Sequence, residues 1–293
     1  MTGPDAGLTA RLARLTGAEV TGLQRVGGQH QCSHYRVTLS GNRLAFAKVA
    51  AGGPAGILVA EAHGLRWLAA AGAVPVPPVL GADAGTLVIG WLPSDTPSEH
   101  AGTQAADNFG RDLAALHAAG PGTFGAPWPG FIASLPLSNA SAGTWPDWYA
   151  TERLLPFLRR AADSAALGEP GIRLVEQVIS RITELAGPPE PPSRVHGDCW
   201  SGNVLWSGGR GWLIDPAAHG GHRETDLAML ALFGAPHLNR IISAYTEAVP
   251  LATGWRDRVP LHQLHPLLVH ACLFGPGYAG AVQAAARSAL AAA

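Results

Sequence analysis

Short apolar runs dominate the first third of the chain, and longer amphipathic segments dominate the rest. Apolar runs of strand length predict strands over residues 20–26, 35–39, 44–49 and 86–92. Apolar residues spaced three and four apart predict helices over residues 8–15, 57–71, 104–119, 173–185, 227–233 and 261–292, the last interrupted at residues 275–280. The pattern therefore predicts a small sheet-containing unit followed by a mostly helical one.

A predicted hairpin late in the chain gathers three polar side chains. Strands over residues 204–206 and 212–214 flank a glycine-rich turn, which folds Asp215 back beside the segment that carries Asp198 and Asn203. This arrangement supplies one possible base and two hard oxygen ligands at one end of a ribbon. The alternative is an ordinary polar loop in which Asp198 only forms a turn.

Phosphoryl transfer of the protein-kinase type requires such a set. An Asp accepts the proton of the attacking hydroxyl, while an Asn five residues later and a further Asp hold magnesium on the phosphates. Magnesium favours a sparse set of oxygen ligands. Asp198 as the base, with Asn203 and Asp215 as ligands of Mg²⁺, matches this template in spacing and order. No Gly-x-x-x-x-Gly-Lys sequence occurs, which excludes the P-loop kinases.

The basic residues point the same way. Lys and Arg total 20, and Lys48 is the single lysine among them, within the predicted strand of residues 44–49. A compact ammonium can reach phosphates from a strand, which a planar guanidinium does less well. A functional role therefore explains Lys48 better than the chance retention of a single surface lysine does.

Composition and charge exclude several other classes. The net charge is -1 and 14% of residues are charged, so neither a nucleic acid nor an acidic membrane is an expected partner. The apolar stretches are interrupted by prolines and predict no membrane span, and no signal peptide is evident. Three widely spaced cysteines argue against a disulfide framework and favour a reducing cytoplasm.

Two motifs carry a resemblance to a known family. His-Gly-Asp-Cys-Trp-Ser-Gly-Asn-Val-Leu-Trp at residues 196–206 and Gly-His-Arg-Glu-Thr-Asp-Leu-Ala-Met at residues 221–229 resemble the fructosamine (ketosamine) kinases. That family is a branch of the aminoglycoside-phosphotransferase, protein-kinase-like superfamily. The resemblance implies an α+β bilobal fold: an N-lobe of residues 1–93, with an antiparallel sheet and one helix, and a mostly helical C-lobe of residues 94–293. ATP and Mg²⁺ are the implied cofactors, bound in the cleft between the lobes.

The same resemblance assigns the nucleotide site. The loop with Gly27 and Gly28 is expected to cover the phosphates, and Glu61 is expected to pair with Lys48. A hinge that includes Gly90 and Leu92 is expected to bind adenine through its backbone, although Gly90 replaces the usual Glu.

The implied acceptor is the 3-hydroxyl of a ketosamine, either free or attached to a protein lysine. Trp200 and His219 are the candidate acceptor-side residues, and the segment 131–139 resembles the family's substrate-side loop. A kinase for an aminoglycoside or amino alcohol is the main alternative, and a catalytically silent nucleotide-binding protein is another.

Other polar residues receive structural or minor interpretations. His117 is expected to pack within a helix, and Asp226 to cap the helix of residues 227–233. A transition-metal site formed by histidines and acids between residues 196 and 222 is a weak alternative. Cys32 lies in the predicted phosphate loop, where its oxidation could block nucleotide binding.

Overall fold

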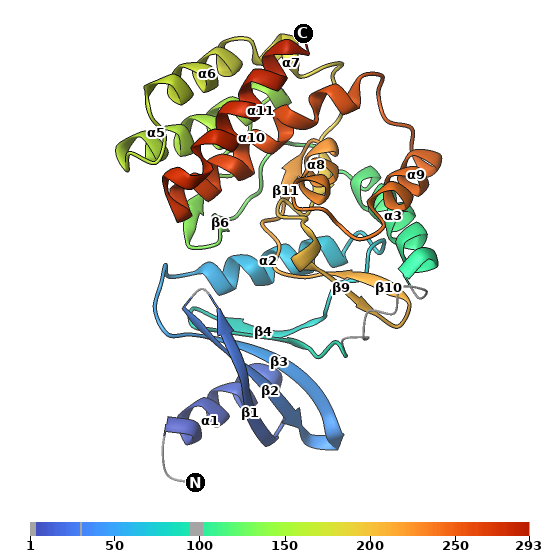
Figure 1. The fold of residues 1–293 in the computed structure, drawn as a ribbon. Helices are drawn as coiled ribbons and strands as arrows, with labels where there is room; N and C mark the ends of the chain where they lie inside the picture. The colour runs from blue at the N-terminus through green and yellow to red at the C-terminus, as the bar shows by residue number, and fades with distance from the viewer. Residues whose placement is uncertain (1–3, 30, 94–101, 293) are drawn as a thin grey trace.

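The computed structural model describes residues 4–29, 31–93 and 102–292. Its first part is an antiparallel sheet of order β1-β2-β3-β5-β4, at the bottom of Figure 1. The strands are β1 (Val20–Gln29), β2 (Cys32–Leu39), β3 (Arg43–Ala50), β4 (Val79–Asp83) and β5 (Thr86–Gly90), with the 3-10 turn η1 (Ser40–Asn42) before β3. The four predicted strands are confirmed. The sequence analysis missed β4, because three prolines directly before it read as an extended connector.

Helices cover both faces of this sheet. Because side chains alternate along a strand, Val88 packs with Leu12 of α1 (Pro4–Thr16), whereas Leu87 and Ile89 belong to the core around α2 (Ile57–Ala69). In Figure 1, α1 lies below the sheet and α2 lies between the sheet and the helical part. The sheet unit thus has two flanking helices, one more than the family pattern implied.

The second part is mostly helical. Its helices are α3 (Gly102–Ala118), α4 (Trp145–Trp148), the π-helix η2 (Tyr149–Leu154), α5 (Leu155–Asp163), α6 (Glu169–Ser180), α7 (Ile182–Leu185), α8 (Glu224–Leu232), α9 (Leu238–Ala248), α10 (Trp255–Phe274) and α11 (Ala279–Ala291). The break before α11 contains the 3-10 turn η4 (Pro276–Tyr278). The glycine- and proline-rich segment at residues 275–280 therefore ends a helix, as predicted.

Three short antiparallel ribbons connect these helices. They are β6 (Gly130–Ile132) with β7 (Leu135–Leu137), β8 (Ser193–Val195) with β11 (His219–Gly221), and β9 (Val204–Ser207) with β10 (Arg210–Leu213). The hairpin predicted around residues 207–211 is confirmed as β9 and β10. The segment 131–139, expected as a substrate-side loop, contains most of β6 and all of β7, and the 3-10 turn η3 (Ser201–Asn203) precedes β9.

A proline inside α10 explains one long-range contact. Pro266 has no amide hydrogen, so the carbonyl of His262 loses its usual partner in the next turn. The buried hydroxyl of Tyr149 lies 2.8 Å from the carbonyl oxygen of Leu261 and 3.3 Å from that of His262. The π-helix that carries Tyr149 is therefore tied to α10 through carbonyls beside the proline.

The sheet unit and the helical part share a hydrophobic core. One cluster joins Leu65 of α2 and Leu87 of β5 to Phe109 of α3, Leu213 of β10 and Tyr245 of α9. Residues 94–101, directly after the expected lobe boundary, lie outside the described residues, so a division near residue 93 stays a proposal. Among the described helices, none combines the length and apolar character that a membrane crossing requires.

Candidate active site

A cavity of about 890 Å³ lies between the sheet unit and the helical part. Its lining comes from β2, β3, α2, the end of β5, β6, the segments after β8 and β10, β9, α8 and α10. Of the predicted site residues, those that line it are Lys48, Glu61, Gly90, Leu92, Asp198, Trp200, Asn203 and Asp215. The fold therefore gathers residues from distant parts of the chain into one cleft.

Lys48 stands at the centre of a buried ion-pair cluster. Its Nζ lies 2.8 Å from Oε1 of Glu61 and 2.6 Å from Oδ1 of Asp215. Burial opposes the charge of Lys48, but the two carboxylates outweigh that effect and raise its pKa above the usual value. The same cation holds the pKa of Asp215 below its usual range despite burial. Lys48 is thus a fixed positive charge aimed into the cleft.

Asp198 and Asn203 are held together by local hydrogen bonds. Nδ2 of Asn203 donates to the backbone carbonyl of Asp198 and to its Oδ2, both at 2.9 Å. Burial raises the pKa of Asp198 to about 7, and the charges of Asp215 and Asp226 act in the same direction. A carboxylate with a pKa near neutrality can accept a proton from a hydroxyl more effectively than one with an ordinary pKa.

Asp226 fixes the backbone of this segment, a role that the sequence analysis missed. Its carboxylate accepts from the amide of His196 at 2.7 Å and from the amide of Gly197 at 3.0 Å, and it lies 3.1 Å from Nε2 of His117. Asp226 lies inside the first turn of α8, not at its N-cap, so the predicted capping role is wrong. His117 is buried against Tyr245, as expected for a packed histidine.

Gly197 is required by the geometry of the loop. Its φ is 81°, and a Cβ atom there would lie 2.3 Å from the carbonyl oxygen of Ala217. The same virtual Cβ would lie 2.9 Å from the ring of His219, which is buried, pairs with Val195 in the β8–β11 ribbon and does not line the cleft. The expected acceptor contact of His219 is therefore wrong: its ring packs against Gly197, next to Asp198.

Asp215 adopts an unusual backbone conformation. Its φ is 53°, in the left-handed region that Asp tolerates better than most residues. Its side chain remains 41% exposed toward the cleft while one oxygen contacts Lys48. Together with the amide oxygen of Asn203, this carboxylate forms a sparse set of hard oxygen ligands, which fits Mg²⁺.

Two backbone amides of the expected hinge already donate hydrogen bonds within the protein. The amide of Gly90 donates to the carbonyl of Pro78 at 2.9 Å, and the amide of Trp91 donates to the carbonyl of Leu44 at 3.3 Å. A Cβ on Gly90 would lie 2.9 Å from the ring of Pro78, which explains a glycine where the family has Glu. Gly90 and Leu92 both line the cleft.

Two expectations about the β1–β2 hairpin need correction. Gly27 and Gly28 lie within β1, paired with His34 and Ser33, and do not line the cleft. The strand pairing continues further than the glycines suggested, and their contact with phosphates stays a prediction. Cys32 does line the cleft, but burial raises its pKa, which disfavours the reactive thiolate at neutral pH.

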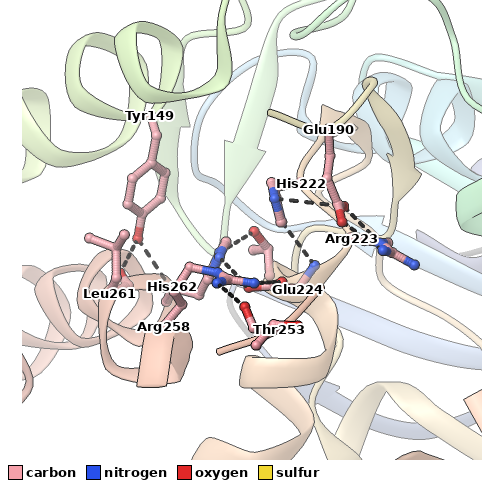
Figure 2. A network of polar contacts seen from close by, with 10 residues as sticks. Tyr149, Glu190, His222, Arg223, Glu224, Thr253, Arg258, Leu261 and His262 are labelled. Atoms are coloured by element: carbon pink, nitrogen blue, oxygen red, sulfur yellow. Dashed lines mark hydrogen bonds and ion pairs between the residues drawn. The ribbon is translucent and has the colours of Figure 1, made fainter. Parts of the chain in front are cut away.

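A second polar network lies beside α8 and α10 (Figure 2). Glu224 is 1% exposed, and its two oxygens accept from Nε and Nη2 of Arg258 at 2.9 and 2.6 Å. Glu224, His222 and His262 offer ligand atoms within 4.8 Å of one another. The positively charged guanidinium of Arg258 already donates to both carboxylate oxygens of Glu224. We therefore interpret Glu224 and Arg258 as a structural ion pair. His222 belongs to this network, so the weak alternative of a metal site with His196, Asp198 and His219 is not supported.

Buried histidines should make the protein sensitive to acid. Burial lowers the pKa of four histidines, that of His219 to about 3; the four are His196, His219, His222 and His265. Below about pH 6.5 the unfolded chain binds more protons on these imidazoles than the folded chain does, so stability falls as the pH falls. Asp198 and Glu61 act in the opposite direction, because their pKa values are raised to about 7 in the folded state. The folded chain therefore binds protons at these two carboxyl groups before the unfolded chain does, which partly offsets the loss of stability.

We therefore expect the free energy of unfolding to fall by about 2 kcal/mol per pH unit between about pH 6 and pH 5. Urea unfolding at closely spaced pH values measures this slope. A stability that stays constant or rises over that interval would show that the four imidazoles are not held neutral in the folded state.

The fold and the cleft together define a protein-kinase-like phosphotransferase that acts on a hydroxyl group. A family model described as fructosamine kinase matches residues 8–292, and the chain belongs to this family. A protein of Thermus thermophilus assigned as a ketoamine kinase is 34% identical over 236 residues, which cover 80% of this chain and 83% of the relative.

Solved structures agree with this membership. A crystal structure from Thermobifida fusca, assigned as a fructosamine-3-kinase, has 50% identity and a TM-score of 0.92, covering 97% of this chain and 98% of that one. The aminoglycoside phosphotransferase APH(4)-Ia shares the fold, with a TM-score of 0.63 and 18% identity, covering 98% of this chain and 99% of its own. The resemblance in the sequence motifs is confirmed.

Proposed function

We propose that this protein transfers the γ-phosphoryl group of ATP to the 3-hydroxyl of a ketosamine. The observation that carries the proposal is the convergence of Lys48, Asp198 and Asp215 in one cleft of a chain from the fructosamine kinase family. The names of its relatives from Thermus thermophilus and Thermobifida fusca support the acceptor class.

Each cleft residue has a defined task in this proposal. Asp198 accepts the proton of the attacking hydroxyl, and the hydrogen bond from Asn203 orients its carboxylate. Lys48, positioned by Glu61, binds phosphate oxygens of the nucleotide. Mg²⁺ held by Asn203 and Asp215 would neutralise charge on the phosphates.

The adenine site follows from the hinge. Because the amides of Gly90 and Trp91 already donate within the protein, we assign the amide of Leu92 as the donor to adenine, with the carbonyl of Gly90 as an acceptor. Loss of the usual hinge Glu does not disturb this assignment, because both groups are backbone. The Gly27–Gly28 segment has no assigned contact with phosphate.

The charge of the cleft distinguishes a sugar acceptor from a polycationic one. The acids that line it are Glu61, Asp198 and Asp215, and all three belong to the phosphoryl-transfer machinery. No described residue supplies a further carboxylate for several ammonium groups, which an aminoglycoside would require. A ketosamine, with one amine and several hydroxyls, is the better match. Free and protein-bound ketosamines both remain candidate substrates.

The proposal is tested by acceptor-dependent ADP release. A ketosamine made from glucose and benzylamine should stimulate Mg²⁺-dependent ADP formation, whereas glucose, fructose, benzylamine and an aminoglycoside should not. Stimulation by the aminoglycoside alone would show that the protein is a kinase whose acceptor is an aminoglycoside and not a ketosamine. ATP binding without turnover of any alcohol would favour a silent nucleotide-binding protein.

A further inference from the structure

A continuous row of aromatic rings runs from the catalytic loop to the mouth of the cleft. The ring centroids of Trp200 and Phe233 are 6.1 Å apart, and those of Phe233 and His270 are 5.0 Å apart. His270 is 5.5 Å from Phe274 and 5.0 Å from Tyr278. All five residues line the cleft, and we call them the aromatic shelf.

The shelf begins beside the base and ends in solvent. Trp200 follows Asp198 by two residues, whereas Phe274 is 62% exposed and Phe233 is 38% exposed. An exposed Phe at the rim of a cleft has no role in the core and costs free energy of hydration, which a bound apolar group recovers. The shelf is therefore continuous with the proposed acceptor site and extends beyond it.

The shelf contains no Lys, Arg, Asp or Glu side chain. The Lys, Arg, Asp and Glu residues among the described lining are Lys48, Glu61, Asp198 and Asp215, and none belongs to the shelf. Nδ1 of His270 lies 2.7 Å from the carbonyl oxygen of Pro266, so this nitrogen donates to that carbonyl. An aromatic surface without Lys or Arg favours apolar or aromatic ligand groups and offers no ion-pair partner to a carboxylate, which would lose hydration there.

A polar atom deeper in the cleft indicates which part of a ligand lies there. His265 lines the cleft on the same helix face as Val269, and its Nε2 is buried without a hydrogen-bond partner in the described part of the chain. Such an atom calls for a donor or acceptor from a ligand, and a sugar hydroxyl supplies both. We therefore place the sugar in the part of the cleft lined by Asp198 and His265, and the remainder of the ligand along the shelf.

We propose that the aromatic shelf binds the amine substituent of the ketosamine, and that Phe274 makes the enzyme select adducts whose nitrogen carries an apolar or aromatic group. The inference rests on the proposed function. In a ketosamine the nitrogen is attached to C1, two carbons from the 3-hydroxyl, so a hydroxyl at Asp198 directs the substituent outward. The tetramethylene chain of a glycated lysine and a benzyl group both have the required character.

The test compares three ketosamines that share the glucose-derived sugar and carry benzylamine, methylamine or glycine. We expect kcat/KM to fall in that order, with about a tenfold advantage of the benzylamine adduct over the methylamine adduct. In Phe274→Ser this ratio should fall severalfold toward one. Val26→Ser is the matched control, because Val26 is also an exposed apolar residue, 43% exposed, but does not line the cleft.

Several outcomes would overturn the inference. The first is a ratio of kcat/KM for the benzylamine adduct to that for the methylamine adduct near one in the wild type. The second is a ratio that Phe274→Ser leaves unchanged. Either result would show that the shelf does not select substrates. A change from dimer to monomer in Phe274→Ser at an unchanged ratio would make the shelf an interface between copies of this chain. If Phe274→Ser does not fold, Phe274→Leu replaces it, with a smaller drop expected. Failure of all three adducts to release ADP would instead contradict the proposed function.

Discussion

Asp198→Asn is expected to lower kcat for ketosamine phosphorylation by about 10²–10⁴-fold, because the amide cannot accept the proton of the attacking hydroxyl. The substitution keeps the shape of the side chain and removes a charge that burial disfavours, since the pKa of Asp198 is raised to about 7. Stability should therefore be unchanged or slightly increased, and ATP should still bind. Steady-state kinetics, thermal unfolding and calorimetric titration with ATP measure these three quantities.

The matched control is Asp163→Asn, which makes the same exchange at an exposed position at the end of α5. It should leave kcat unchanged. A kcat for Asp198→Asn within tenfold of the wild type would assign the proton transfer to another group or to solvent. A loss of ATP binding together with kcat would show that the side chain organises the nucleotide site instead of the acceptor.

Glu224→Gln is expected to lower the free energy of unfolding by about 3–5 kcal/mol, because it leaves the guanidinium of Arg258 buried without its counter-ion. Both carboxylate oxygens accept from Arg258, and both side chains are nearly inaccessible to solvent. Chemical denaturation followed by tryptophan fluorescence measures the change. The stability loss should exceed that of any single surface ion pair in the described structure.

Glu169→Gln serves as the control. Glu169 makes a 3.0 Å contact with Arg173 on an exposed helix face, where both side chains are solvated. Removing it should cost no more than about 0.5 kcal/mol. Equal effects of the two substitutions would mean that the Glu224–Arg258 pair is not buried in solution.

Local patterns in the sequence predicted the parts of the site that local structure builds. The β9–β10 hairpin follows from two apolar runs around a glycine-rich turn, and it brings Asp215 to Asp198 and Asn203. The pair between Lys48 and Glu61 followed from family resemblance, since nothing local in the sequence joins a strand to a helix. In the structure Lys48 contacts Glu61 and Asn203 contacts Asp198 at hydrogen-bond distances, and Asp215 lines the same cleft.

Features that depend on long-range burial were missed. Asp226 directly precedes the apolar part of α8, and only tertiary structure shows that its carboxylate accepts from amides thirty and twenty-nine residues earlier. A buried acid among apolar neighbours was the available signal, because such a group requires partners. His219 was assigned to the acceptor side from family resemblance, but it pairs with Val195 in β11, is buried and does not line the cleft.

Strand ends were predicted less accurately than strand existence. The two glycines in β1 resembled a loop, yet their pairing with β2 continues to Gln29 and Cys32. Prolines before β4 concealed an edge strand, which tolerates them because its outer side lacks a partner strand. In both cases pairing with a neighbouring strand outweighed local propensity.

The identity of the phosphorylated product tests the central claim most directly. After incubation of the wild-type enzyme with ATP, Mg²⁺ and the ketosamine of glucose and benzylamine, NMR spectroscopy locates the new phosphate by its coupling to carbon. The account predicts a single product with phosphate on the oxygen of C3, formed at least about a hundredfold more slowly by Asp198→Asn. Phosphate on another oxygen, or on the acceptor's amine, would contradict the proposed placement of the 3-hydroxyl at Asp198.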